Sequence, residues 1–239
     1  LIINDTPGVA VTKADVKPGE QVGTSDFLIE TQPTPFYDGY VVGDNTGSKY
    51  TGKNRVMAGV NLNSPLNLGD KFSISGLISN GEDIKNYKVG YEIPLMSNGL
   101  KAQTSYSKTD YNLVKLPMNG YGNTSTLEAG ISYPIIRTRM ENLNFTTLYS
   151  NKEMKDYGDS SNLREINSIK LGLDYTKNHT LLGFDSVSKI ESFCTLGKLD
   201  IKNNSRKSDD ESGPDNNGTY SKVNLNLNNQ TQFNPTYSL

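Results

Sequence analysis

The sequence has few of the residues that enzymes use for covalent and acid–base chemistry. Among its 239 residues, Cys194 is the single cysteine, His179 is the single histidine, and tryptophan is absent. A lone cysteine excludes an intrachain disulfide and a thiolate metal cluster, and we expect Cys194 to be an ordinary strand residue. A lone histidine has no partner for a metal site or a proton relay, and we place His179 in a turn at TKNHT. The sequence therefore predicts no enzyme, with no catalytic residue, no cofactor and no bound metal.

Long apolar runs and basic clusters are also missing. No segment approaches the roughly 20 apolar residues that a membrane-spanning helix needs, so any membrane crossing must be made of strands. The net charge is −2, and no cluster of Lys and Arg is flanked by aromatic residues, which argues against nucleic-acid binding. The acidic segment 209–215 lacks the regular spacing of a calcium loop, and we interpret it as a solvated loop.

The sequence does contain a sustained alternation of apolar and polar residues. In residues 87–95, for example, Tyr87, Val89 and Tyr91 alternate with Lys88, Gly90 and Glu92. Side chains change face at each step along a strand, so this pattern predicts strands with one apolar and one polar face. Strands of this kind are expected at 36–43, 53–62, 71–79, 87–95, 99–108, 126–135, 141–150, 166–177, 189–200 and 219–229.

The connections between these strands are alternately long and short. Polar, Gly-rich connections such as 111–125, 151–165 and 201–218 alternate with tighter ones such as 63–70 and 95–99. Alternate connections of an up-and-down meander lie at opposite ends of the sheet, and outer-membrane barrels have long loops at one end and short turns at the other. The hydrophobic content of 34% is low for a packed soluble core and is compatible with a barrel whose interior face is polar.

Tyrosine is the dominant aromatic residue, with 14 Tyr against 7 Phe. Many tyrosines lie near strand ends or on the apolar side of a strand, where a membrane–water interface would hold the ring in lipid and the hydroxyl in water. The alternative is that they are there for their strand propensity alone. The tyrosines concerned are Tyr37, Tyr40, Tyr50, Tyr87, Tyr106, Tyr111, Tyr121, Tyr133, Tyr149, Tyr175 and Tyr220.

The polar sides of the strands supply the candidate functional residues. If the sheet forms a barrel, these side chains face its lumen; in any other sheet they would only keep the wet face soluble, and the sequence leaves both roles open. The lumen-facing candidates are Arg55, Lys88, Glu92, Lys101, Gln103, Glu128, Lys170 and Asp174.

Residues 1–34 differ from the rest of the chain. Strands are expected at 9–16 and 24–32 around a KPGEQVG turn, and Pro33 and Pro35 stiffen the link to the strands beyond them. Two strands alone cannot bury a face, so we expect residues 1–34 to be the end of a small α+β domain and residues 35–239 to form the barrel sheet. Because the chain starts with Leu1 and no signal sequence, we expect it to be mature or a fragment.

Several segments resemble a known family. NDTPGV followed by a PG turn and GTSDFLIE resembles the end of a polypeptide-transport-associated (POTRA) domain. DNTGSKYTGKNRVMAGVNLNSPLNLGDKFSIS, YKVGYEIPLMSNGLK, ISYPIIRTRMENL and GTYSKVNLNLNNQTQFNP resemble barrel strands of two-partner secretion transporters of the ShlB/FhaC/HecB haemolysin secretion/activation type. The Val-Arg-Gly-Tyr loop motif of that family does not occur here, so none of its functional residues is carried over.

The resemblance implies a mainly β protein: an incomplete antiparallel up-and-down transmembrane β-barrel, about ten strands of a presumed total of about 16, preceded by the last strands of a POTRA domain. It also implies a place in the bacterial outer membrane, with residues 1–34 in the periplasm. The expected function is a pore that secretes a large partner protein, of haemolysin or adhesin type, by passive threading of the unfolded chain. Its partners would be that protein and the lipid of the outer membrane.

A soluble extracellular all-β adhesin or binding module is the alternative. It requires the apolar side of the strands to be buried against a second sheet. The barrel, by contrast, predicts a single curved sheet that stays open because its closing strands are lacking.

Overall fold

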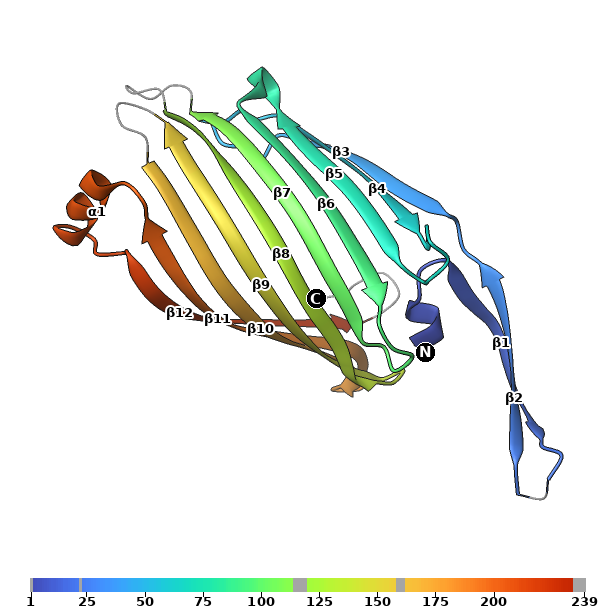
Figure 1. Ribbon diagram of the computed structural model, residues 1–239. Coiled ribbons are helices and arrows are strands. Elements are labelled where there is room, and N and C mark those ends of the chain that lie inside the picture. The colour runs from blue at the N-terminus through green and yellow to red at the C-terminus, as the bar shows by residue number, and fades with distance from the viewer. Residues whose placement is uncertain (1, 22, 114–119, 158–161, 234–239) are drawn as a thin grey trace.

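The computed structural model describes residues 2–21, 23–113, 120–157 and 162–233, and most of them are strand (Figure 1). A 3₁₀ turn and a two-stranded hairpin, η1 (Ile2–Asp5), β1 (Val9–Pro18) and β2 (Ser25–Pro33), come first. The next strands are β3 (Tyr37–Asp44), β4 (Arg55–Asn63), β5 (Lys71–Ser79), β6 (Ile84–Pro94) and β7 (Lys101–Leu113). The remaining strands are β8 (Gly120–Arg137), β9 (Glu141–Tyr157), β10 (Asn162–Leu181), β11 (Phe184–Ile201) and β12 (Gly218–Gln232). Two short helices, η2 (Asn80–Glu82) and α1 (Asn204–Glu211), lie in connections.

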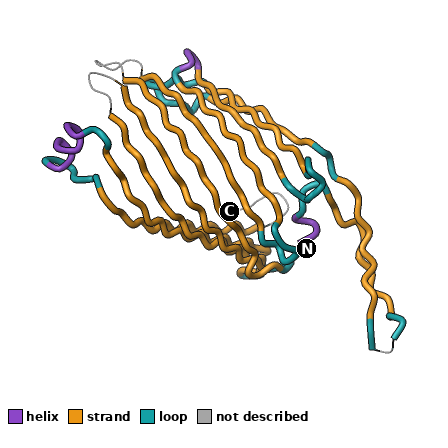
Figure 2. Tube along the Cα trace, viewed as in Figure 1, coloured by secondary structure: helices purple, strands orange, loops and turns teal. Residues whose placement is uncertain are grey.

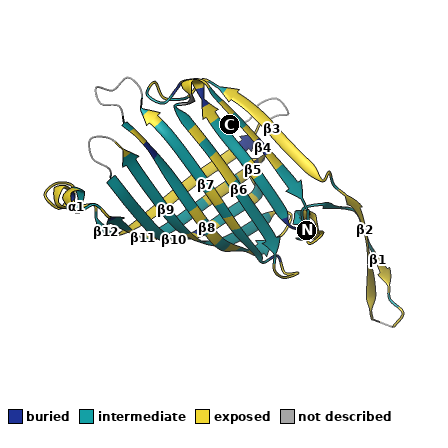
Figure 3. Cartoon of the chain, turned by 45° about the horizontal axis from the view of Figure 1, so that its top comes forward, coloured by how far each residue is buried: buried dark blue, intermediate teal, exposed yellow. Residues whose placement is uncertain are grey.

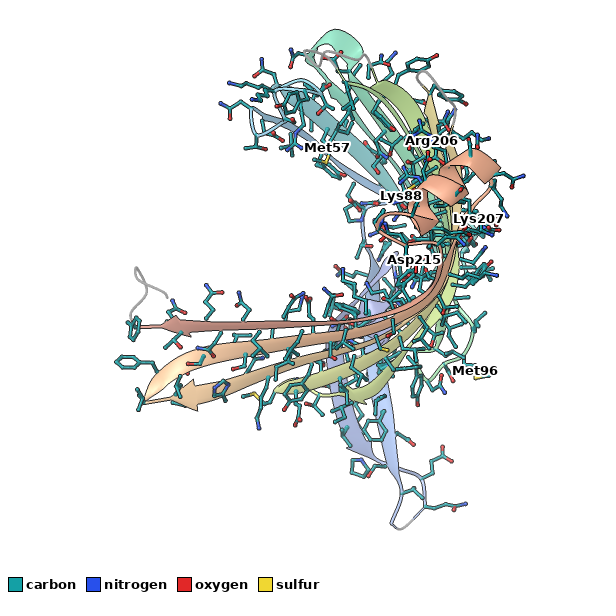
Figure 4. All side chains as sticks on the ribbon, turned by 90° about the vertical axis from the view of Figure 1, so that its left-hand side faces the viewer. Met57, Lys88, Met96, Arg206, Lys207 and Asp215 are labelled. Carbon is teal, nitrogen blue, oxygen red and sulfur yellow. The ribbon has the colours of Figure 1, made fainter. Side chains whose placement is uncertain are left out.

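Strands β3 to β12 form one ten-stranded antiparallel sheet in chain order. Each strand pairs with its neighbours in the sequence, and β3 and β12 are the two edges. The sheet twists and curves into an open trough, whose two edges do not meet (Figures 2 and 4). An open curved sheet of about ten strands was predicted from the sequence, and the structure confirms it.

The β1–β2 hairpin forms a separate sheet that projects away from the large one, whereas η1 lies against the rim of the large sheet (Figure 1). The hairpin register runs from Val9 opposite Pro33 to Pro18 opposite Ser25. Both of its strands match those expected from the sequence. None of the helices in the described residues is long and apolar enough to cross a bilayer.

The turn between β4 and β5 shows how the short connections are fixed. Asp70 is fully buried and accepts hydrogen bonds from the backbone N–H groups of Leu66 and Leu68, both at 3.3 Å, and from the Tyr91 hydroxyl at 2.9 Å. Burial pushes the pKa of Asp70 up, but these hydrogen bonds to the carboxylate outweigh it and the pKa is lowered. One carboxylate therefore ties the turn to the neighbouring strand β6.

Strands β8 to β11 are longer than predicted. The residues 120–125, 151–157 and 162–165, expected in loops, continue the ladders, and His179 lies within β10 rather than in a turn. The β10–β11 turn contains only Leu182 and Gly183, both at positive φ. Polar and Gly-rich composition suggested loops, but a strand that extends beyond a membrane into water can be polar on both faces.

The acidic connection after β11 also differs from the prediction. Residues Asn204–Glu211 form α1, whose first turn is capped by the Asn203 side chain. Asp210 is buried and accepts a hydrogen bond from the Asn217 N–H at 2.8 Å, whereas the rest of the segment 209–215 is exposed. The segment is therefore solvated, as expected, but its first residues belong to a helix and not to a loop.

On the large sheet, the apolar side chains are more exposed than the polar ones. In β8, the outward residues Leu127, Ala129 and Ile131 are exposed, whereas the alternating polar residues are half-buried (Figure 3). Similar exposure recurs across the sheet, for example at Ile74 (50%) and Leu225 (61%). Within the described residues, Ile201 is the one buried hydrophobic side chain. The adhesin alternative required a second sheet to cover the apolar face. In the described residues, no second sheet covers it.

The width of the apolar face fits a bilayer. On the outer face of β10, the residues Ile169, Leu171, Leu173 and Tyr175 lie between polar Asn167 and Lys177. The interval is 177 − 167 = 10 residues. At about 3.4 Å per residue and a tilt of about 45°, it spans about 24 Å along the membrane normal, close to the apolar band of outer-membrane barrels.

Tyrosine hydroxyls mark the borders of this band. The Tyr149 hydroxyl donates to Asn167 at 2.8 Å on one side, and the Tyr175 hydroxyl donates to Glu141 at 2.8 Å on the other. These contacts support the interface role for tyrosines on the outer face. Tyr40, Tyr111 and Tyr220 belong to a different group, because their pairing places them on the opposite, polar face.

Candidate functional site: the polar concave face of the sheet

The polar face of the ten-stranded sheet is its concave face. Seen from the side, the sheet curves around Lys88 and Met57, which lie on its inner side (Figure 4). Directly paired residues of neighbouring strands point to the same face, so the register assigns every other side chain relative to Lys88. The residues that it places on the concave face include all the sequence-predicted candidates: Arg55, Lys88, Glu92, Lys101, Gln103, Glu128, Lys170 and Asp174.

Three of the candidate cations on this face are paired with acids along the wall. Lys101 Nζ lies 2.9 Å from Glu92 Oε1, and Lys88 Nζ lies 3.8 Å from Glu128 Oε2. Arg55 donates from Nε and Nη2 to the two carboxylate oxygens of Asp44, at 3.0 and 3.1 Å. Within each pair the two opposite charges neutralise each other. This part of the wall is therefore strongly polar but has no net potential of one sign.

Gln103, Lys170 and Asp174 occupy different parts of the concave face. Gln103 lines a hollow of about 420 Å³ together with Lys88, Glu92 and Glu128. The Lys170 ammonium lies over the Phe193 ring, 3.8 Å from its centroid. Asp174 lies in a larger hollow of about 860 Å³ at the rim of the sheet, beside the short β6–β7 connection. The eight candidates therefore share one surface but do not converge on one point, as expected of a wall and not of an active site.

The 3₁₀ turn η1 closes one side of the larger hollow. Its Asp5 carboxylate accepts hydrogen bonds from Arg137 Nε at 2.6 Å and Nη2 at 2.5 Å, across 132 positions of sequence. Lys101 Nζ adds a contact of 3.4 Å to the Asp5 carbonyl oxygen. The hydrogen bonds from Arg137 lower the pKa of Asp5 against the opposing effect of burial. We call the Asp5–Arg137 pair the rim latch.

The rim latch was missed in the sequence because a β-bulge reverses the alternation there. The register of β8 against β9 shifts between Pro134 and Ile136, so Ile136 pairs with Leu143 and Arg137 pairs with Asn142. Strict alternation would have placed Arg137 on the apolar face with Ile131 and Ile135. Pro134, inside a strand, was a signal for this bulge, because proline cannot donate to a ladder.

A second polar cluster lies at the other rim of the concave face. Asp156 accepts a hydrogen bond from the Tyr111 hydroxyl and forms an ion pair with Arg164. The three residues come from β7, β9 and β10. This cluster was also missed, because Tyr111 lies in 111–125 and both Asp156 and Arg164 lie in 151–165. Both segments were expected to form loops, and a loop carries no face assignment.

The described residues hold no group of His, Cys, Asp and Glu side chains that could bind a metal ion. Cys194 pairs with Leu171 and Val223 and lies on the outer face. The described part of the concave face therefore offers hydrogen-bonding and charged groups along its whole length, and nothing arranged for covalent chemistry.

Comparison with known proteins identifies the family. The model of the haemolysin secretion/activation protein family ShlB/FhaC/HecB matches residues 23–238. The chain belongs to this family. The curated relatives that it matches are named as transporters and not as enzymes.

Individual curated proteins match large parts of the chain. The heme/hemopexin transporter protein HuxB of Haemophilus influenzae (strain 86-028NP) is 29% identical over 185 residues, which are 74% of this chain and 32% of HuxB. The hemolysin transporter protein HpmB of Proteus mirabilis is 23% identical over 171 residues, which are 67% of this chain and 30% of HpmB. The chain thus spans about a third of the length of these relatives.

The solved structures support the same fold. CdiB from Escherichia coli aligns with a TM-score of 0.67 and 24% identity, over 82% of this chain and 38% of CdiB. CdiB from Acinetobacter baumannii aligns with a TM-score of 0.51 and 12% identity, over 85% of this chain and 53% of CdiB. The ten-stranded sheet is therefore part of a barrel wall of this type.

Proposed function

We propose that this chain forms part of the wall of an outer-membrane pore that secretes a partner protein, and that the partner passes as an unfolded chain along the concave face. No nucleotide hydrolysis is involved, and the polypeptide threads passively. The observation that carries this proposal is the sorting of the two faces: half-exposed apolar side chains outside, paired charges and hydroxyls inside. Such an outer face is stable in lipid, whereas each fully exposed large apolar side chain would cost about 1.5–3 kcal/mol in water.

Residues 1–34 have a separate role in this proposal. We assign them to the periplasm, as the last strands of a POTRA-type domain. Every residue of β2 is exposed, and in the described residues the β1–β2 pair has no further strand beside it. A free edge of this kind can accept an extended segment of an unfolded partner by strand addition.

The relatives differ in what their names say they transport: heme/hemopexin for HuxB and hemolysin for HpmB. We therefore define the proposed cargo only by its chemistry, as an unfolded polypeptide. A wall of locally neutralised charges suits such a cargo, because it offers hydrogen bonds to any sequence and strong attraction to none.

Site-specific crosslinking to a stalled partner tests the route. Cys194 is first replaced by Ala in the protein expressed from its complete reading frame. A single cysteine is then introduced as Gln103→Cys on the concave face, or as Ala102→Cys, its neighbour on the outer face and hence the matched control. A partner protein halted in transit by a fused, folded module should crosslink to position 103 and not to position 102.

The outcomes are distinct. Equal crosslinking at both positions, or crosslinking at neither while secretion continues, would show that the partner takes another route. A conductance measurement in planar bilayers adds an independent criterion, because a protein that inserts and never conducts is not a pore.

A further inference from the structure

The concave face carries four aromatic side chains among the described strand residues: Tyr40, Tyr111, Phe193 and Tyr220. Each of them is paired directly with a glycine of the neighbouring strand. The pairs are Tyr40 with Gly59, Tyr111 with Gly122, Phe193 with Gly172 and Tyr220 with Gly197. We call these four the ring–glycine pairs.

In three of the pairs the ring supplies the atoms nearest to the glycine; at Gly122, an added Cβ atom would lie 2.5 Å from the Tyr111 hydroxyl oxygen but also 2.4 Å from the backbone oxygen of Lys155. A Cβ atom added at Gly59 would come within 2.7 Å of the Tyr40 ring, one at Gly172 within 2.9 Å of Phe193, and one at Gly197 within 2.5 Å of Tyr220. These distances are shorter than real Cβ atoms tolerate, so any other residue would displace the ring. Gly59 and Gly172 are buried beneath their rings.

The outer face provides an internal comparison. Tyr87 is also paired directly with a glycine, Gly76, but on the apolar side of the sheet. A Cβ atom at Gly76 would meet only the backbone oxygen of Asn86, at 3.5 Å, and no atom of the Tyr87 ring. A glycine directly opposite an aromatic residue is therefore not sufficient to hold the ring against the sheet: the four concave-face rings lie there, and the Tyr87 ring on the outer face does not.

The Phe193 pair also restrains a charge. The Lys170 ammonium lies 3.8 Å above the centroid of the Phe193 ring, which itself lies on Gly172. Three layers, Gly172, Phe193 and Lys170, are thus stacked along the wall. The stack keeps the Phe193 and Lys170 side chains close to the sheet, where otherwise they would extend into the interior.

We propose that the four glycines are positioning residues for transport: they hold the aromatic rings flat against the wall and so keep the path along the concave face wide. The inference rests on the proposed function, since it takes the concave face as the transport path. A flat ring offers its face to a passing polypeptide without obstructing it. A ring forced upright would narrow the path by the length of its side chain.

Single-channel conductance tests the proposal directly. Gly172→Ala, made in the protein expressed from its complete reading frame, should push the Phe193 ring inward and lower the conductance. The double variant Gly172→Ala with Phe193→Ala has no ring to displace, so its conductance should return to at least the wild-type level. Gly76→Ala is the matched control, because it is the same substitution opposite a tyrosine on the outer face, and its conductance should equal that of the wild type.

The readout separates the proposal from a merely structural role for the glycines. If Gly172→Ala lowers the thermal stability of the protein but leaves its conductance at the wild-type value, the glycines support folding only and the proposal fails. It also fails if Phe193→Ala does not restore the conductance lost in Gly172→Ala. If the wild-type protein inserts and does not conduct, the proposed function itself is wrong, which is a different outcome from either of these.

Discussion

The rim latch should hold η1 against the wall with a measurable free energy. The Asp5–Arg137 pair is bidentate, with contacts of 2.5 and 2.6 Å, and its side chains are 35% and 28% exposed. Exposed ion pairs contribute about 0.2–1 kcal/mol, and breaking a buried pair costs about 3–5 kcal/mol. For this intermediate exposure we expect a coupling of about 1–2 kcal/mol, which changes the ratio of docked to undocked η1 by about 5–30-fold.

Amide hydrogen exchange of residues 1–11 measures that ratio. The relevant amides are those of Thr6 and Val11, which donate to Ile3 O at 3.1 Å and to Asn4 Oδ1 at 2.6 Å. Asp5→Asn and Arg137→Gln should each accelerate their exchange by the factor above, and the double variant should exchange no faster than the faster of the two single variants. Asp15→Asn is the control, because Asp15 pairs with Lys13 on the exposed hairpin, away from the rim.

Additive effects of the two substitutions would refute the latch, because residues that act through one shared interaction cannot both remove it. Unchanged exchange in both single variants would refute it as well. Either result would mean that η1 is held at the rim by its other contacts: the Lys101 Nζ contact to the Asp5 carbonyl oxygen, and the apolar side chains of Ile2 and Ile3, which line the hollow.

Three further predictions concern pH, the Asp70 turn and the apolar band. Since the pKa of Asp5 is lowered from its ordinary value of 3.8, the latch should be fully formed above that value and should be lost as the pH falls through the lowered pKa. The exchange protection of residues 2–11, measured relative to the unstructured chain at the same pH, should therefore fall only below about pH 4. Asp70→Ala should destabilise the protein by about 2 kcal/mol, seen as a lower midpoint of denaturant unfolding, because it leaves two turn N–H groups and the Tyr91 hydroxyl without their acceptor; an unchanged midpoint would contradict this. Leu171→Arg, near the middle of the band, should cost about 2–4 kcal/mol when the protein folds into a bilayer, whereas Asn167→Arg at its border should cost about 0–1 kcal/mol; equal costs would show that the band is misplaced.

The fold could be predicted from the sequence because period-two alternation is a local signal that a lipid-facing strand must keep. All ten expected strands of the large sheet are present, and the hairpin of residues 9–33 matches as well. The ends of the strands were predicted less well, because alternation is not required outside the lipid-facing part of a strand. Residues such as Asn162 to Glu165 extend β10 past the band, where both faces are in water and alternation is no longer required.

The candidate residues were predicted from the same alternation of side chains between the two faces of a strand. Alternation gives the face on which a residue lies and says nothing of what the residue contacts. The register gives every one of the eight its expected face, but their contact with a passing chain stays a prediction. Nothing in the local sequence marked Phe193 as the partner of Gly172, since 21 positions separate them and only the strand register brings them together. Ring–glycine pairs can be found only after the register is known.

The β-bulge after Pro134 determines the face of the sheet on which Arg137 lies. Under strict alternation, Arg137 would point out of the sheet at the edge of the apolar band, where an unpaired guanidinium is costly. With the bulge, the alternation slips by one position, Arg137 turns to the concave face opposite Asn142, and η1 gains its partner for Asp5. An irregularity that breaks the pattern used to predict the strands thus creates the long-range ion pair between the start of the chain and the wall.

Exchanging two neighbouring residues of β8 tests this dependence on parity. Ile136→Arg combined with Arg137→Ile keeps the composition but moves the guanidinium to the outer face, because Ile136 pairs with outward-facing Leu143. Residues 1–11 should then exchange as fast as they do in Asp5→Asn. Deleting Ile135 should leave their exchange slow, because it removes the bulge together with its extra residue and so leaves Arg137 on the concave face. Fast exchange after the deletion, or slow exchange after the swap, would mean that the face of Arg137 does not control the latch.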